Sequence, residues 1–205
     1  MDKYLTGRAL EKLSPQKIYV PEKKLIDTKS FFLFKRKDFV RFWKILKRDL
    51  DTMWIMVKPG DEGSSTGICL LRSPKDLELY VHFVKKHANS IPAHSFYLQK
   101  GPIEMPARKM KHLLFEKFIV TDKVTVVKNK LHWETKSQWI EITCGVLEKN
   151  GRMRAFNPSV TVSSGHVLSL EEKFQGGTGI NITPPPQPFV KKSAIESAKK
   201  QIETV

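Results

Sequence analysis

The chain has 205 residues and a formal net charge of +15, from 36 lysines and arginines against 21 aspartates and glutamates. This length favours one domain with tails, and a hydrophobic content of 40% is too high for a disordered protein. No apolar run approaches the roughly 20 residues of a membrane span, and no secretory signal opens the chain. We therefore expect a cytoplasmic protein, with the nucleus as a second compartment, whose surface attracts an anionic partner.

The first fifty residues are expected to form an arm, a strand and a helix. Residues 1–24 are polar and contain two prolines, which predicts a flexible N-terminal arm with at most one short helix. Residues 25–34, LIDTKSFFLF, are bulky and predict a strand. Residues 38–51 have helical periodicity, so the apolar side should cover a sheet and the basic side should face solvent. The apolar side holds Phe39, Phe42, Trp43, Leu46 and Leu50, and the basic side holds Lys37, Arg41, Lys44, Lys47 and Arg48.

A second helix is predicted after two short strands. The strands are expected at 53–57 and 68–72, with a turn-rich loop at 58–67 between them. Ser73 is the expected N-cap of the helix, a proline occupies its first position, and Asp76 stands three residues after the cap. This combination is typical of a helix N-terminus.

The pattern becomes β after Pro92. Short strands are expected near 94–98, 111–120, 123–128, 131–135, 138–148, 152–156, 159–163 and 166–170. The dipeptide Asn150-Gly151 is a strong signal for a tight hairpin. Because the connections are short, the strands should be mostly antiparallel.

The end of the chain has a different composition. Residues 175–188, QGGTGINITPPPQP, have no periodicity and predict an extended linker before a short terminal helix. The predicted organisation is an arm at 1–24, a single α+β core domain at 25–172, and a flexible linker with a basic tail helix at 173–205. The fold class is therefore α+β, with a mostly antiparallel β core and two amphipathic helices in the N-terminal half.

The sequence carries no motif for metal binding and no cysteine in a protease-like context. Cys69 and Cys144 lie in apolar runs and are expected to be buried free thiols. No His-x-x-x-His or Cys-x-x-Cys occurs. The GGTG at 176–179 lacks the Lys-Ser/Thr of a phosphate-binding loop. We therefore expect no metal, no cofactor and no enzymatic activity, with a site assembled from distant residues as the remaining alternative.

Basic residues carry the only positive functional signal. They concentrate in the helix at 38–51, in the segment 100–130 and in the tail. Lysine and arginine bind a phosphate backbone through charge, without reading sequence. The predicted nucleic-acid-binding residues are Arg41, Lys44, Lys47, Arg48, Arg108, Lys109, Lys111, Lys128 and Lys130.

These residues predict a non-enzymatic protein that engages RNA or single-stranded nucleic acid through its backbone. The alternative is a matrix-type protein that self-associates and lies on an anionic membrane surface and a nucleocapsid. A third contact is possible at Pro184–Pro188, which suits the aromatic groove of a partner domain. In layout, with a β-rich core, a basic surface and proline-bearing tails, the chain resembles viral movement proteins and viral matrix proteins.

Overall fold

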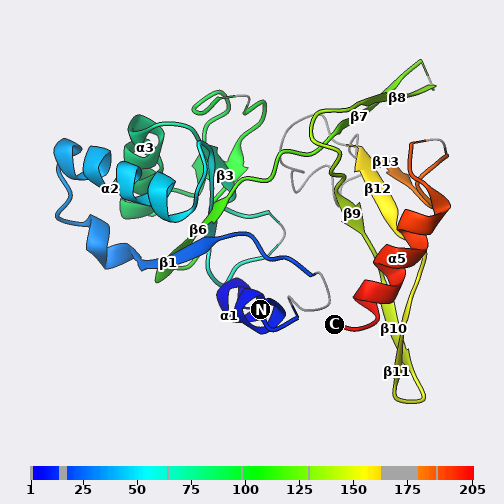
Figure 1. Ribbon diagram of the computed structural model, residues 1–205. Coiled ribbons are helices and arrows are strands. Elements are labelled where there is room, and N and C mark those ends of the chain that lie inside the picture. Colours follow the sequence, from blue (N-terminus) through cyan, green and yellow to red (C-terminus); the bar gives the residue numbers. More distant parts are fainter. Residues whose placement is uncertain are drawn as a thin grey trace.

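The computed structural model describes residues 2–13, 18–63, 65–97, 99–128, 130–162, 180–187 and 189–205. The fold is α+β, as predicted, with helices in the N-terminal half, a short helix near the C-terminus and several antiparallel sheets (Figure 1). Among the described residues, no helix is long and apolar enough to cross a membrane.

The largest sheet in the described part of the chain has four antiparallel strands in the order β1-β6-β2-β3. The strands are β1 (Lys23–Asp27), β6 (His112–Lys117), β2 (Ile55–Pro59) and β3 (Cys69–Leu71). Two helices, α2 (Arg36–Asp49) and α3 (Pro74–Lys85), lie together beside this sheet (Figure 1).

Alternation along the strands gives the sheet two different faces. The face toward α2 and α3 forms the main hydrophobic core together with those helices. Its strand residues include Ile55, Val57, Leu113 and Phe115, which are fully buried. The helix residues predicted for the apolar side of 38–51 are buried or half-buried in the same core, so that prediction is confirmed.

The start of α3 follows the predicted capping pattern. The Ser73 hydroxyl accepts a hydrogen bond from the Asp76 backbone N–H at 3.2 Å, and the Asp76 carboxylate accepts one from the Ser73 N–H at 3.1 Å. This reciprocal pair satisfies backbone donors that have no partner inside the helix. The helix therefore begins where the sequence predicts.

The second half of the chain carries shorter strands and a separate apolar cluster. Val124, Val160 and Val162 are its buried members. The strands are β7 (Lys123–Val127), β8 (Lys130–Glu134), β9 (Ile142–Thr143), β10 (Val146–Lys149), β11 (Arg152–Ala155), β12 (Ser159–Val162) and β13 (Ile180–Ile182). The predicted hairpin joins β10 to β11, with positive φ at both Asn150 and Gly151.

Five further elements complete the described part of the fold. They are α1 (Lys3–Glu11), the 3-10 helix η2 (Thr28–Phe31), the paired strands β4 (Ser90–Ile91) and β5 (Ile103–Glu104), and α5 (Lys192–Ile202). Helix α1 lies in the predicted arm, and α5 is the predicted terminal helix.

The strand predicted at 25–34 is only partly correct. It ends at Asp27, because the Asp27 carboxylate accepts a hydrogen bond from the Lys29 N–H at 2.8 Å and starts η2. The predicted strand near 94–98 is also wrong for its described residues. The Gln99 side chain bonds the carbonyls of Pro92 and Gly101 and closes a loop there. The strand predicted at 166–170 lies outside the described residues.

The linker predicted at 175–188 is wrong in its middle. Residues 180–182 form β13, which pairs with β12 from Val160↔Ile182 to Val162↔Ile180. Beyond it, Val190 and Ile195 are buried. The backbone of residues 180–182 pairs with the edge of β12, and this pairing outweighs the surrounding glycines and prolines. The boundaries at 24/25 and 172/173 stay predictions.

Candidate functional site

The basic face of α2 is exposed, as the sequence predicts. Arg41, Lys44 and Arg48 are exposed and Lys47 is half-buried. Arg48 is paired, since its Nη2 lies 2.7 Å from Oδ1 of Asp49. Within the described residues, no carboxylate lies within ion-pair distance of the other three. Three cations of this helix are therefore available to an anion.

The segment at 107–111 lies elsewhere. The Arg108 Nε donates to the Glu62 carboxylate at 2.7 Å, and this hydrogen bond raises the pKa of Arg108. The carbonyl of Lys111 accepts a hydrogen bond from the Thr28 N–H at 2.9 Å, which places the segment beside η2. Lys109 Nζ lies 5.9 Å from the ring centre of Phe32.

The predicted site residues form three separate groups. Residues 107–111 precede the start of β6 at His112, whereas the C-terminal end of α2 lies at the opposite end of β6. Lys117, the last residue of β6, forms an ion pair at 3.3 Å with Asp51, which follows the end of α2. Lys128 and Lys130 form a third group at the tip of the β7–β8 hairpin, where Val127 pairs with Lys130. The fold does not bring the nine predicted residues together.

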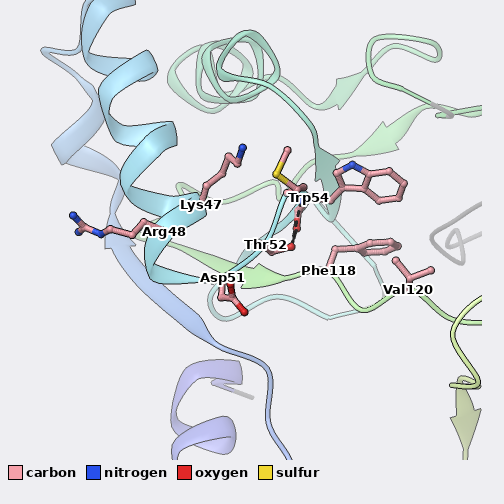
Figure 2. A pocket seen from close by; sticks show the side chains of 8 residues that line it. Lys47, Arg48, Asp51, Thr52, Trp54, Phe118 and Val120 are labelled. Atoms are coloured by element: carbon pink, nitrogen blue, oxygen red, sulfur yellow. Dashed lines mark hydrogen bonds between the residues drawn. The ribbon is translucent and has the colours of Figure 1, made fainter.

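A pocket of about 640 Å³ lies at the C-terminal end of α2 (Figure 2). The aromatic rings of Trp54 and Phe118 line it, with ring centres 5.8 Å apart. Arg72 does not line the pocket, but its guanidinium lies over the Trp54 ring, with Cζ 5.0 Å from the ring centre. The lining residues are Lys47, Arg48, Asp51, Thr52, Met53, Trp54, Phe118 and Val120. Two predicted cations therefore share a pocket with two aromatic rings that the sequence did not single out.

The other face of the four-stranded sheet carries charged residues. Alternation places Lys23 of β1, Lys58 of β2 and Glu116 of β6 on this face, because their neighbours belong to the main core. They lie among the apolar side chains of Leu25, Met56, Leu70 and Leu114. Charged groups on a largely apolar face are costly unless they are paired or functional.

Lys58 and Glu116 form an ion pair with restricted access to water. Their side chains are 25% and 12% exposed. The Lys23 side chain is only 3% exposed, and its Nζ lies 3.2 Å from Oε1 of Glu11 without making a hydrogen bond within the described part of the chain. The Lys23 amine lies against α1, since a Cβ added at Gly7 would collide with it.

Lys3 brings another amine to this face. Its Nζ donates to the carbonyl of Glu62, and also to that of Pro59 at 3.3 Å. Burial lowers the pKa of Lys3, and the nearby charge of Lys58 lowers it further, while Asp61, Glu62 and Glu116 oppose the shift. The amines of Lys3 and Lys58 are therefore close enough to repel one another.

The loop after β2 lies over the same end of the sheet. It is the glycine- and serine-containing stretch 60–67, GDEGSSTG, of which Ser64 is outside the described residues. The Gly60 N–H donates to the His112 carbonyl at 3.1 Å, and the Gly67 N–H donates to the Glu104 carbonyl at 2.7 Å. Both ends of the loop are therefore anchored. We call Lys3, Lys23, Lys58, Glu116 and this loop the Lys58 face.

Little in the sequence predicts the Lys58 face. Lys58 lies in the stretch predicted as a loop, and it is the single polar residue of the short strand β2. Glu116 is 58 positions further along the chain.

In the described part of the chain, no group of three or more His, Cys, Asp or Glu side chains could hold a metal ion. Cys69 is a buried free thiol as predicted, whereas Cys144 is only half-buried.

Comparison with known proteins shows a likeness in fold. No family model matches the chain, and no curated protein matches it. The structure is similar to that of D-alanyl-alanine synthetase A from Vibrio cholerae O1 biovar eltor str. N16961, with a TM-score of 0.51 and 10% sequence identity. The similarity covers 95% of this chain and 44% of the synthetase, so the chain spans less than half the length of that protein. At this identity the likeness concerns the fold alone.

Proposed function

We propose that the Lys58 face binds the phosphate groups of a ligand in a synthetase-type reaction, one that joins a carboxylate to an amine. The observation that carries this proposal is the set of amines from Lys3, Lys23 and Lys58 on one sheet face, at low exposure and next to an anchored Gly/Ser loop. The reaction class is taken from the synthetase that shares this fold.

The chemistry of such a reaction explains the residue types. Joining a carboxylate to an amine requires an activated carboxylate, and phosphorylation is a common means of activation. Protein groups assist phosphoryl transfer mainly by positioning and by stabilising negative charge. Lysine supplies a compact positive charge, and low exposure to water strengthens its field. Lys58 is held in place by Glu116, and Lys3 by the carbonyls of Pro59 and Glu62.

Calorimetric titration with adenosine triphosphate in magnesium-containing buffer tests this function. The wild-type chain should bind the triphosphate, and adenosine without phosphates should bind far more weakly. Lys58→Met should reduce the affinity about 10- to 100-fold, the usual effect of losing a hydrogen bond to a charged group. Lys24→Met is the matched control, because Lys24 lies on the opposite face of the same sheet and is also ion-paired, with Asp49. Equal affinity of Lys58→Met and the wild type would refute the proposal.

A second candidate function is the one expected from the sequence, a non-enzymatic protein that binds RNA through its backbone. The observation that favours it is the face of α2, where Arg41, Lys44 and Lys47 have no ion-pair partner within the described residues and lead to the pocket of Trp54 and Phe118. Aromatic rings beside cations suit single-stranded nucleic acid, because bases stack on the rings while phosphates meet the cations. Fluorescence anisotropy with a labelled RNA oligonucleotide tests it.

A further inference from the structure

The turn between η2 and α2 exposes two large apolar side chains. Leu33 is 91% exposed and Phe32 is 46% exposed. Their neighbours in the sequence lie in the core, where Phe31 is 1% exposed and Phe34 packs against it with ring centres 5.2 Å apart. The turn is also closed by backbone hydrogen bonds from Phe32 N to Lys29 O and from Phe34 N to Phe31 O. Phe32 and Leu33 are therefore held outward by a well-anchored turn.

Cations surround this turn. Lys29, Lys35, Arg36 and Lys37 adjoin it in the sequence and are exposed. Two more come from other elements. Lys109 Nζ lies 5.9 Å from the Phe32 ring centre, and Lys85 Nζ donates to the Phe32 carbonyl at 3.4 Å.

Two carboxylates lie close to this turn in the sequence, and each accepts a hydrogen bond from a backbone N–H. Asp27 accepts a hydrogen bond from the Lys29 N–H, and Asp38 accepts one from the Lys35 N–H at 2.9 Å. Six cations against two carboxylates leave the surroundings of the turn strongly positive.

We propose that Phe32 and Leu33 insert into the surface of an anionic lipid bilayer, with the surrounding lysines and Arg36 on the lipid headgroups. Apolar side chains ringed by basic residues suit the boundary between headgroups and acyl chains. Each lysine or arginine near an anionic bilayer adds to the attraction. Two inserted side chains give a peripheral, reversible attachment. This inference does not depend on the ligand of the Lys58 face.

The structure also decides which part of this region can insert. The aromatic side of α2 cannot do so, because Phe39 and Trp43 are only 4% and 6% exposed and belong to the main core. The membrane contact is therefore the turn before α2. An RNA partner fits the turn poorly, because Leu33, its most exposed side chain, has no ring on which a base could stack.

Flotation with lipid vesicles tests the proposal on the whole chain. Vesicles of phosphatidylcholine with 30% phosphatidylserine should carry the wild-type protein, and vesicles of phosphatidylcholine alone should carry much less. Phe32→Ala/Leu33→Ala should weaken binding at least about tenfold, because the variant no longer buries these two apolar side chains in lipid. Lys35→Gln and Lys37→Gln should each weaken it about fivefold. Leu147→Ala, which removes another exposed leucine, is the matched control and should bind like the wild type.

A probe at position 33 adds a direct readout of insertion. Leu33→Cys in a Cys144→Ser background, labelled with a polarity-sensitive dye, leaves Cys69 unlabelled because that thiol is buried. Its emission should shift to shorter wavelength with anionic vesicles. Failure of the wild type to float, equal flotation of the Phe32/Leu33 variant, or an unshifted probe would each overturn the proposal and leave the turn as a contact for another protein.

Discussion

The ring of Trp133 stacks on the ring of Phe189, with ring centres 5.1 Å apart and planes within 6°. This contact joins β8 to the stretch before α5, a part of the chain that the sequence predicts to be an isolated tail. The backbone N–H of Ala155 adds a second connection, donating to the Glu203 carboxylate at 2.9 Å. The C-terminal residues are therefore part of the folded second half.

Removing the C-terminal residues should destabilise the protein. Truncation after Glu172 removes β13 from the edge of β12 and exposes Trp133, so we expect a lower melting temperature and a red-shifted tryptophan emission. Phe189→Ala alone should cost about 1 kcal/mol, the usual value of an aromatic pair. Trp139→Phe is the control, since Trp139 is 61% exposed. A truncated chain that melts like the full chain would restore the prediction of an independent tail.

Trp43 should be a structural residue of the core. Trp43→Ala removes a side chain that is 6% exposed and should lower the free energy of unfolding by about 3–5 kcal/mol. Val40→Ala on the same helix is the comparison, because Val40 is 41% exposed and its loss should cost about 0.5 kcal/mol or less. Urea unfolding measures both. Equal stability of the two variants would contradict the assignment of Trp43 to the core.

The second candidate function predicts how RNA binding depends on salt. Arg41→Glu/Lys44→Glu/Lys47→Glu should weaken RNA binding equally for all sequences, because phosphate contacts do not read bases. The slope of log affinity against log salt should fall by about 0.7 for each phosphate that the variant no longer neutralises. Lys128→Glu/Lys130→Glu, at the tip of a distant hairpin, shows whether the third basic group contributes. If affinity and slope both stay unchanged in the α2 variant, this face does not bind RNA.

Asp122 should make the second half of the chain sensitive to acid. Backbone hydrogen bonds from Ser137 and then Lys136 lower the pKa of Asp122 to about 2, and the Trp133 indole N–H also donates to it at 3.3 Å. The carboxylate therefore stabilises the folded state above about pH 4, its pKa in the unfolded chain, and this contribution is lost as the pH falls toward 2.

The variant Asp122→Asn tests that dependence. It should be less stable than the wild type at pH 6, and the difference should shrink between pH 4 and pH 2, measured by urea unfolding with tryptophan emission as the signal. Asp2→Asn is a control that removes another exposed carboxylate, one that caps α1. A difference that stays constant over this pH range would mean that the Asp122 carboxylate does not titrate with folding.

Local sequence determines much of this fold. The two sides of α2, the cap at Ser73 and the hairpin at Asn150-Gly151 were all predictable, because each depends on residues within a few positions of one another. The basic residues of α2 were likewise predictable as an exposed face. Periodicity and turn chemistry decide these features before any long-range contact forms.

The tertiary structure alone decides the rest. Lys58 meets Glu116 because β2 and β6 pair in one particular register, and a shift by one residue would move either side chain to the other face. The pocket of Trp54 and Phe118 depends on the same pairing. Residues 180–182 form a strand because they pair with the edge of β12 that β9 leaves open. Such contacts join residues far apart in the chain, and no local pattern specifies the partner.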